Sequence, residues 1–225
     1  MGNLNRPLSA AMWSRALLMW GILAIVALLL GVAALWMGTF IQANIEDELE
    51  AQQISFPEEE RLSESERGID GITNYAGEQL STGDHAQVYS EYILLHMNES
   101  AAEAGYPGAT YATLGAVQRE LRTAVQQAQD AGDEAALAEA EAELAEVTAL
   151  RNTMLTGSNL RGNLLSAYGW GNVGQGVLFL GLGIIVLAIV FALLFVFEWR
   201  KGHLPEPAAD SERGGLPAGA TTPAS

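Results

Sequence analysis

Two histidines, two tyrosines and two glutamates recur along one segment of the chain at spacings of three and four residues. All six are residue types that titrate or bind ligands. They are His85, Tyr89, Tyr92, His96, Glu99 and Glu103. Because an α-helix completes a turn in about 3.6 residues, this spacing places all six side chains on one helical face. We take this face as the candidate ligand or metal site of the chain.

A single metal ion cannot bind both histidines of this face. Eleven residues separate His85 from His96, which corresponds to about 16 Å along a helix. His96 and Glu99 supply two ligands, but a metal site needs three or four, and no second histidine cluster completes one. The simpler interpretation is a half-buried tyrosine face with polar ends. A metal or small-ligand site remains the alternative.

The remaining sequence excludes several kinds of chemistry. The chain has no cysteine, which excludes disulfides, thiolate metal sites and a cysteine nucleophile. It contains no nucleophile elbow, Walker motif, HExxH motif or dinucleotide-binding motif. Its formal net charge of −16 disfavours nucleic acid as a partner. We therefore expect a protein that is not an enzyme and has no catalytic residue, metal or cofactor.

Two apolar segments point to the lipid bilayer. Residues 16–38 carry no charged side chain, and neither do residues 173–197. Each segment is longer than the ~20 residues that cross a bilayer core of about 30 Å, so we predict two transmembrane helices. Cleavage of the first as a signal peptide is the alternative, but a signal h-region has only about 7 to 15 residues.

Basic residues beside the two segments predict the topology. Arg6 and Arg15 precede the first segment, and Arg200 and Lys201 follow the second. Basic residues near span ends stay in the cytoplasm, so both termini are expected on the cytoplasmic side of the plasma membrane. The predicted regions are a cytoplasmic tail (1–15), an extracytoplasmic domain (39–172) and a disordered cytoplasmic tail (198–225). The outer domain is acidic, with 23 acidic and 6 basic residues.

The pattern of the outer domain is helical throughout, which predicts an all-α fold. Ser55 with Glu58, and Ser63 with Glu66, match the capping-box pattern. Asp84 is a predicted N-cap for the helix that carries the histidine and tyrosine face. Further on, residues 111–129 and 134–154 predict an antiparallel helical hairpin. Its apolar stripe is thin, and consists of Leu114, Val117, Leu121, Leu137, Leu144 and Val147.

Small residues form stripes along both apolar segments. Small side chains let membrane helices approach closely, so we interpret these stripes as helix-packing surfaces. In the first segment the stripe comprises Ala24, Ala27, Gly31, Ala34 and Gly38. The second region has one stripe of Gly162, Gly169, Gly176 and Gly183 and another of Ala167, Gly174, Gly181 and Ala188. These two stripes lie about 140° apart. One is expected to meet the first span, which leaves the other for a partner or for lipid.

Four sequence pieces carry a resemblance to a known group: "AQQISFP", "YAGEQLSTGDHAQVYSEYILLHM", "TYATLG" and "LRNTMLTGSNLRGNLLSAYGWGNVGQ". They resemble uncharacterised actinobacterial two-span membrane proteins with a helical extracytoplasmic domain. The likeness covers roughly residues 50–180 and implies topology and fold. Some members of the group carry a ring-opening-dioxygenase label, but the metal ligands of such an enzyme are not evident here.

These observations favour a structural or accessory membrane protein. Its expected partners are the lipid bilayer and either another membrane protein or a second copy of the chain. The alternative is an extracytoplasmic ligand-binding or sensing module. About 28 residues follow the second span, too few for a kinase or a coiled-coil signalling domain, so a sensor of this kind would signal through a partner.

Overall fold

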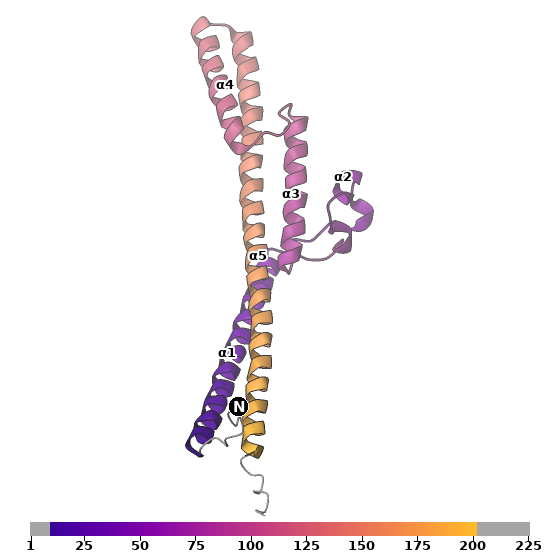
Figure 1. Ribbon diagram of the computed structural model, residues 1–225. Coiled ribbons are helices and arrows are strands. Elements are labelled where there is room, and N and C mark those ends of the chain that lie inside the picture. The colour runs from indigo at the N-terminus through magenta and orange to yellow at the C-terminus, as the bar shows by residue number, and fades with distance from the viewer. Residues whose placement is uncertain (1–9, 202–225) are drawn as a thin grey trace, which may run out of the picture. The chain divides into compact units, whose positions relative to one another are not determined.

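The fold is built from helices. A computed structural model describes residues 10–201, and Figure 1 shows its elements. In chain order they are the helices α1 (Ala10–Glu50), η1 (Glu59–Arg61), α2 (Glu64–Arg67), η2 (Ile72–Asn74), α3 (Gly83–Glu103), α4 (Tyr111–Ala131) and α5 (Glu134–Lys201), where η denotes a 3-10 helix. Within the described residues, the extended pairing is limited to an isolated bridge between Ser55 and Gln79. The all-α prediction is confirmed.

α1 and α5 contain the two apolar segments, and both helices are long and apolar enough to cross a membrane. α5 continues through Lys201, so residues 198–201, which were predicted as the start of the disordered tail, are helical. The Lys201 ammonium lies 3.6 Å from the Glu198 carboxylate and 4.2 Å from the centre of the Phe197 ring, which supports this last turn. Residues 1–9, including Arg6, and residues 202–225 lie outside the described part of the chain.

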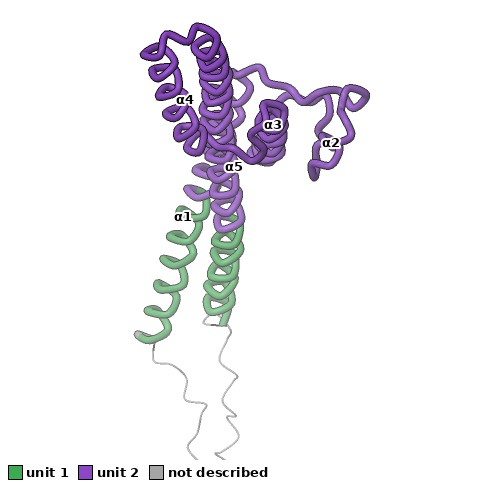
Figure 2. Tube along the Cα trace, turned by 90° about the horizontal axis from the view of Figure 1, so that it is seen from above, with its two compact units in different colours: residues 1–32, 182–225 green, residues 33–181 purple. Residues whose placement is uncertain are grey.

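The chain divides into two compact units, which Figure 2 colours separately. Unit 1 comprises Met1–Val32 and Leu182–Ser225, and unit 2 comprises Ala33–Gly181. The division falls inside the two apolar segments. α1 and α5 are continuous helices, and each contributes residues to both units.

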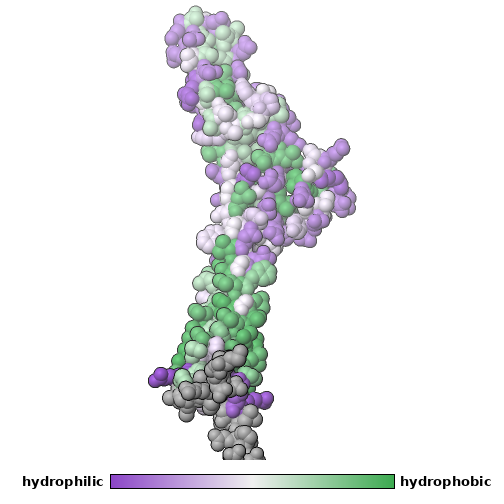
Figure 3. Space-filling model, in the orientation of Figure 1, coloured by the Kyte–Doolittle hydropathy of each residue, from purple (hydrophilic) through white to green (hydrophobic). Residues whose placement is uncertain are grey.

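Unit 1 pairs the apolar part of α1 with the apolar part of α5. The indole Nε1 of Trp13 donates to the backbone oxygen of Glu198 at 3.1 Å. Further along the pair, the rings of Trp20 and Phe191 lie 5.7 Å apart. Most of the large apolar side chains here remain exposed, and Figure 3 shows them as continuous hydrophobic surface. Such a surface is expected of helices that face lipid.

Side-chain caps begin α2, α3 and α4 in unit 2. The Ser63–Glu66 capping box of α2 is confirmed, with Ser63 Oγ accepting from the backbone N–H of Glu66. The N-cap predicted at Asp84 is wrong. Thr82 caps α3, because its Oγ1 accepts from the backbone N–H of His85 at 3.1 Å, and Asp84 lies in the first turn.

The capping box predicted at Ser55 and Glu58 is also wrong. Glu58 precedes η1 without a side-chain cap, and Ser55 is held in an extended conformation by its bridge to Gln79. The neighbouring Phe56 donates its N–H to the oxygen of Glu78 at 2.9 Å. Tertiary pairing of two loop segments therefore overrides the local capping pattern.

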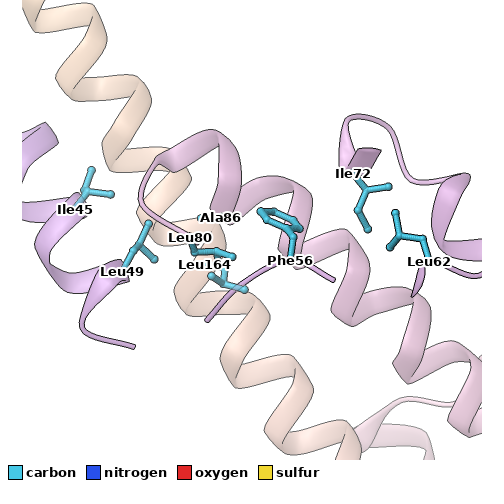
Figure 4. Close-up of a cluster of buried hydrophobic side chains, with 8 residues drawn as sticks. All are labelled: Ile45, Leu49, Phe56, Leu62, Ile72, Leu80, Ala86 and Leu164. Atoms are coloured by element: carbon cyan, nitrogen blue, oxygen red, sulfur yellow. The ribbon is translucent and has the colours of Figure 1, made fainter. Parts of the chain in front are cut away.

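The larger core of unit 2 joins α1, α3, α5 and the connecting loops. Figure 4 shows its buried members, which are Ile45, Leu49, Phe56, Leu62, Ile72, Leu80, Ala86 and Leu164. Ile72 and Leu80 are completely buried although they belong to short or irregular segments. Residues 51–82 therefore act as a structured cover over α3 and not as a loose connection.

A second core holds the helical hairpin formed by α4 and the first part of α5. Its buried members are Ala101, Leu114, Val147, Leu150 and Met154. The hairpin turns at Gly132, whose φ of 69° is left-handed and ends α4. The Arg151 guanidinium lies 4.0 Å above the Tyr111 ring and donates to Gln118 Oε1 at 2.9 Å. These polar contacts strengthen a core with few large side chains.

Candidate functional site

The predicted histidine and tyrosine face of α3 is occupied by aromatic packing. Ring centroids lie 5.2 Å apart for Tyr89 and Tyr92, and 4.5 Å apart for Tyr92 and His96. Phe56 extends this row, since its ring lies 5.4 Å from Tyr89 and 6.0 Å from His85. Edge-to-face and tilted contacts of this kind stabilise a core beyond area burial.

His85 anchors the loop that precedes α3. Its ring is buried and lies 4.5 Å from the Tyr75 ring, measured between centroids. Nδ1 is 3.3 Å from the backbone nitrogen of Ser81 and 3.2 Å from the backbone oxygen of Gln79. Nε2 lies 3.5 Å from the Glu78 carboxylate. Both ring nitrogens are therefore engaged with this loop.

The polar end of the face is organised by Glu66, a residue that the spacing argument did not include. One carboxylate oxygen of Glu66 accepts from the Ser63 N–H at 2.6 Å, which completes the cap of α2. The other lies 2.9 Å from His96 Nε2. His96 Nδ1 is 3.4 Å from Glu99, which also accepts from Ser65 Oγ at 3.0 Å. This cluster fastens α2 to α3.

The cluster shifts the acid–base behaviour of its members. The hydrogen bond from the Ser63 backbone is the largest cause that lowers the pKa of Glu66, and contacts with His96 and Tyr92 act in the same direction. Burial, followed by the charge of Glu66, raises the pKa of Tyr92 to about 12. At neutral pH, Glu66 is therefore a carboxylate and Tyr92 a neutral phenol.

We expect Glu66→Gln to lower the free energy of unfolding by about 1 kcal/mol at pH 7, because hydrogen bonds to a charged group become bonds to a neutral amide. A lowered folded-state pKa contributes stability above the unfolded pKa and loses it as pH falls through the folded value. The difference in the free energy of unfolding between variant and wild type should therefore become smaller at pH values below 4.5, the ordinary pKa of the carboxyl group.

Thermal unfolding in detergent between pH 3.5 and 7 measures this effect. Glu99→Gln is the matched control, because the Glu99 side chain is 41% exposed, against 10% for Glu66, and its ion pair with His96 is therefore worth less. An unchanged difference between Glu66→Gln and wild type across this pH range would contradict the assigned role.

The described face is not arranged as a metal centre. Among residues 10–201, no group of three or more His, Cys, Asp or Glu side chains is placed to hold one ion. The two histidines contact different carboxylates, Glu78 and Glu66, and Glu103 is exposed. Beside His96, a recess of about 530 Å³ lies between α3 and α5 and is lined in part by Tyr92, Met97 and Asn152. Tyr92 and His96 are the members of the face that line this recess.

The helix-packing residues of unit 1 include close contacts across α1 and α5. Ala27 and Ala188 are both buried. A Cβ added to Gly31 would lie 2.7 Å from the Ile185 side chain and 3.1 Å from its backbone nitrogen. Gly31 therefore permits an approach that a larger residue would prevent.

Unit 2 contains the same kind of contact. A Cβ on Gly38 would lie 2.6 Å from Leu178, and one on Gly174 would lie 2.9 Å from Ile41. A Cβ on Gly181 would lie 2.9 Å from the backbone nitrogen of Leu35. Ala34 is half-buried on the same stripe of α1. The stripe of α5 that contains Gly174 and Gly181 is thus filled by α1.

The other stripe of α5 is open. At four positions an added Cβ would meet no described atom within 4 Å, and these positions are Gly162, Gly169, Gly176 and Gly183. The periodicity identified two equivalent stripes, and the contacts distinguish them.

One close contact in unit 2 was not recognised in the sequence. A Cβ on Gly83, the first residue of α3, would lie 3.3 Å from the Cα of Gly171 in α5. The Gln42 side chain donates to the oxygen of Gly171 at 2.8 Å, which ties α1 to the same point. In the sequence, this contact is indicated only by glycine at both positions, Gly83 at the start of α3 and Gly171 near the second predicted span.

Comparisons with known proteins do not assign the chain to a family. No protein family, curated protein or solved structure was found to match the chain.

Proposed function

We propose that this chain is a non-enzymatic, two-span accessory membrane protein whose helical domain acts through a protein partner. One observation carries the proposal, namely that the second glycine stripe of α5 meets no described residue. Glycine costs roughly 1 kcal/mol relative to alanine inside a water-exposed helix. Within a bilayer, small residues promote close contact between helices. A partner helix would use the open stripe in the way that α1 uses the filled one.

The open stripe also continues beyond the second apolar segment. Gly162 and Gly169 precede residue 173, and the apolar side chains of Leu155 and Leu165 are exposed near them. Outside the predicted bilayer core, glycine carries the cost of a water-exposed helix position unless another polypeptide packs on it. This extension supports a protein partner or a second copy of the chain.

The proposed localisation is the plasma membrane, with both termini in the cytoplasm and residues 39–172 outside. Support comes from the charges at the ends of the apolar helices. Arg15 lies in the first turns of α1, and Arg200 and Lys201 lie in the last turn of α5. Basic residues in these positions favour the cytoplasmic side.

We expect Gly176→Leu to leave the chain folded but to remove the partner. The added side chain has open space within the chain, whereas it would separate α5 from a helix packed on that stripe. The measurement is co-purification from native membranes in mild detergent, followed by native-gel size and thermal unfolding of the purified chain.

Gln175→Leu is the matched control, because Gln175 is also exposed on α5 but lies about 100° around the helix from Gly176. It should retain the partner. If Gly176→Leu retains the same partner at the same stoichiometry, or if neither the wild type nor the control has one, the accessory role is wrong.

A ligand-binding or sensing role is the second candidate, and one observation favours it. The Nε of Arg161 is buried and has no hydrogen-bond partner among the described residues, although its Nη2 pairs with Glu91 at 3.2 Å. Arg161 lines a recess of about 310 Å³ with Asn98, Thr110 and Ser158. An oxygen-bearing ligand would satisfy this donor. A rise in melting temperature with small carboxylates that is lost in Arg161→Gln would favour this role.

A further inference from the structure

An apolar groove lies in unit 2 between the end of α1 and the middle of α5. Its volume is about 500 Å³, which is within the range of ligand sites. Ile45 and Leu49 from α1, Leu164 from α5, and Leu80 from the loop before α3 line its base. Figure 4 shows these four side chains converging from the three segments. All four are buried in the core, so the groove has a formed wall.

The lining has little polarity and no positive charge. Asn44, Gln52, Asn163 and Ser166 contribute uncharged polar groups, and Glu48 contributes a carboxylate. None of the described lining residues is basic. A free fatty acid or an anionic headgroup would meet a carboxylate without a compensating cation. The chemistry therefore fits a neutral hydrocarbon chain whose headgroup stays outside.

The groove joins the apolar surface of the spans. Phe40 and Trp170 line it and are 56% and 59% exposed, respectively. Phe40 lies two residues after the first predicted span and Trp170 three residues before the second, at the level where aromatic side chains border the hydrocarbon of a bilayer. Trp36 and Val173, also exposed, continue this surface into the apolar segments. A lipid chain can enter the groove without its headgroup leaving the membrane surface.

We propose that this groove binds one acyl chain of a membrane phospholipid from the leaflet nearest the helical domain. Covering the apolar lining of the groove, which lies outside the two apolar segments, supplies the affinity, while the acyl chain itself only exchanges bilayer hydrocarbon for apolar side chains. The aromatic side chains at the entrance lie at the boundary between hydrocarbon and headgroups. The lipid would fill the space between α1, α5 and the loop at residue 80 and would support the base of the helical domain. This binding requires no protein partner and does not depend on which side of the membrane the domain faces.

Photocrosslinking of the full-length chain in lipid nanodiscs tests the proposal. The probe is a zwitterionic phospholipid with a diazirine in one acyl chain, and the labelled residues are mapped by mass spectrometry. We expect labels in residues 160–170 and 41–54, in addition to the apolar segments. A free fatty acid with the same diazirine should label the groove less than the phospholipid does. Labels confined to the apolar segments, or groove labels from the free acid alone, would overturn the proposal.

A matched pair of substitutions gives a second readout. Asn163 lines the groove and is exposed, so Asn163→Phe should fill it and lower groove labelling about tenfold. Asn172→Phe makes the same change at an exposed position about 180° around α5 and should label as wild type does. Equal groove labelling in all three proteins would overturn the proposal. The mapping in the unmodified chain is decisive even if Asn163→Phe does not fold.

Discussion

Gly181→Leu is expected to lower the free energy of unfolding by about 3 kcal/mol, the upper end of the usual cost of overpacking, and to prevent close packing of α1 on α5 in unit 2. The first added carbon would already lie 2.9 Å from the backbone nitrogen of Leu35 and about 3 Å from its side chain. A side chain can rotate away from such a contact, but a helix backbone cannot. The helices must therefore separate and lose van der Waals contact, which is the principal attraction between helices in lipid.

The measurement is thermal unfolding of the purified chain in detergent, with Gly176→Leu as the matched control on the same helix. At Gly176 no described atom lies within 4 Å of an added Cβ, so the control should unfold near the wild-type temperature. Equal melting temperatures for Gly181→Leu and Gly176→Leu would show that the contact between Gly181 and Leu35 does not hold α1 and α5 together.

Phe56→Ala is expected to lower the free energy of unfolding of unit 2 by about 3–5 kcal/mol. Phe56 is 3% exposed and belongs to the larger core. Its ring contacts Tyr75, His85 and Tyr89, with centroid distances of 5.8, 6.0 and 5.4 Å. Removal of the ring leaves a cavity between α3 and the segment that covers it, and the row of aromatic rings loses its link between loop and helix.

Near-UV circular dichroism during unfolding reports this loss, because the affected side chains are aromatic. Phe179→Ala is the control, since Phe179 is 68% exposed on the apolar part of α5 and has little packing to lose. A change of less than about 1 kcal/mol for Phe56→Ala would mean that residues 51–82 do not form a packed cover on α3.

Several elements could be predicted from local pattern because their signals lie within one stretch of chain. The lengths of the two apolar segments predict α1 and α5 as long apolar helices, and both are present. The Ser63–Glu66 cap forms because its two partners are three residues apart, and the turn at Gly132 forms because glycine readily adopts a positive φ. The 3–4 spacing along α3 places His85, Tyr89, Tyr92 and His96 in one row of ring contacts.

Two local signals failed for identifiable physical reasons. Asp84 is a good capping residue, but Thr82 already accepts from the His85 N–H and begins α3 two residues earlier. Ser55 is followed three residues later by Glu58, which matches the capping-box pattern. However, the hydrogen bond from the Phe56 N–H to the oxygen of Glu78 holds this segment extended. The burial of Phe56 outweighs one side-chain hydrogen bond, since the ring is worth several kcal/mol and a cap about 1 kcal/mol.

By itself, the sequence determined the helical class, the positions of the two apolar helices and the side chains that share each helical face, because these follow from periodicity within single segments. Only the tertiary structure decided that α1 fills the stripe of Gly174 and Gly181 and leaves that of Gly176 open. It also joined Glu66 to His96 across 30 residues and formed the groove at Leu164. These features depend on contacts between segments distant in sequence. Periodicity places a residue on a face, but it does not say which neighbour that face meets.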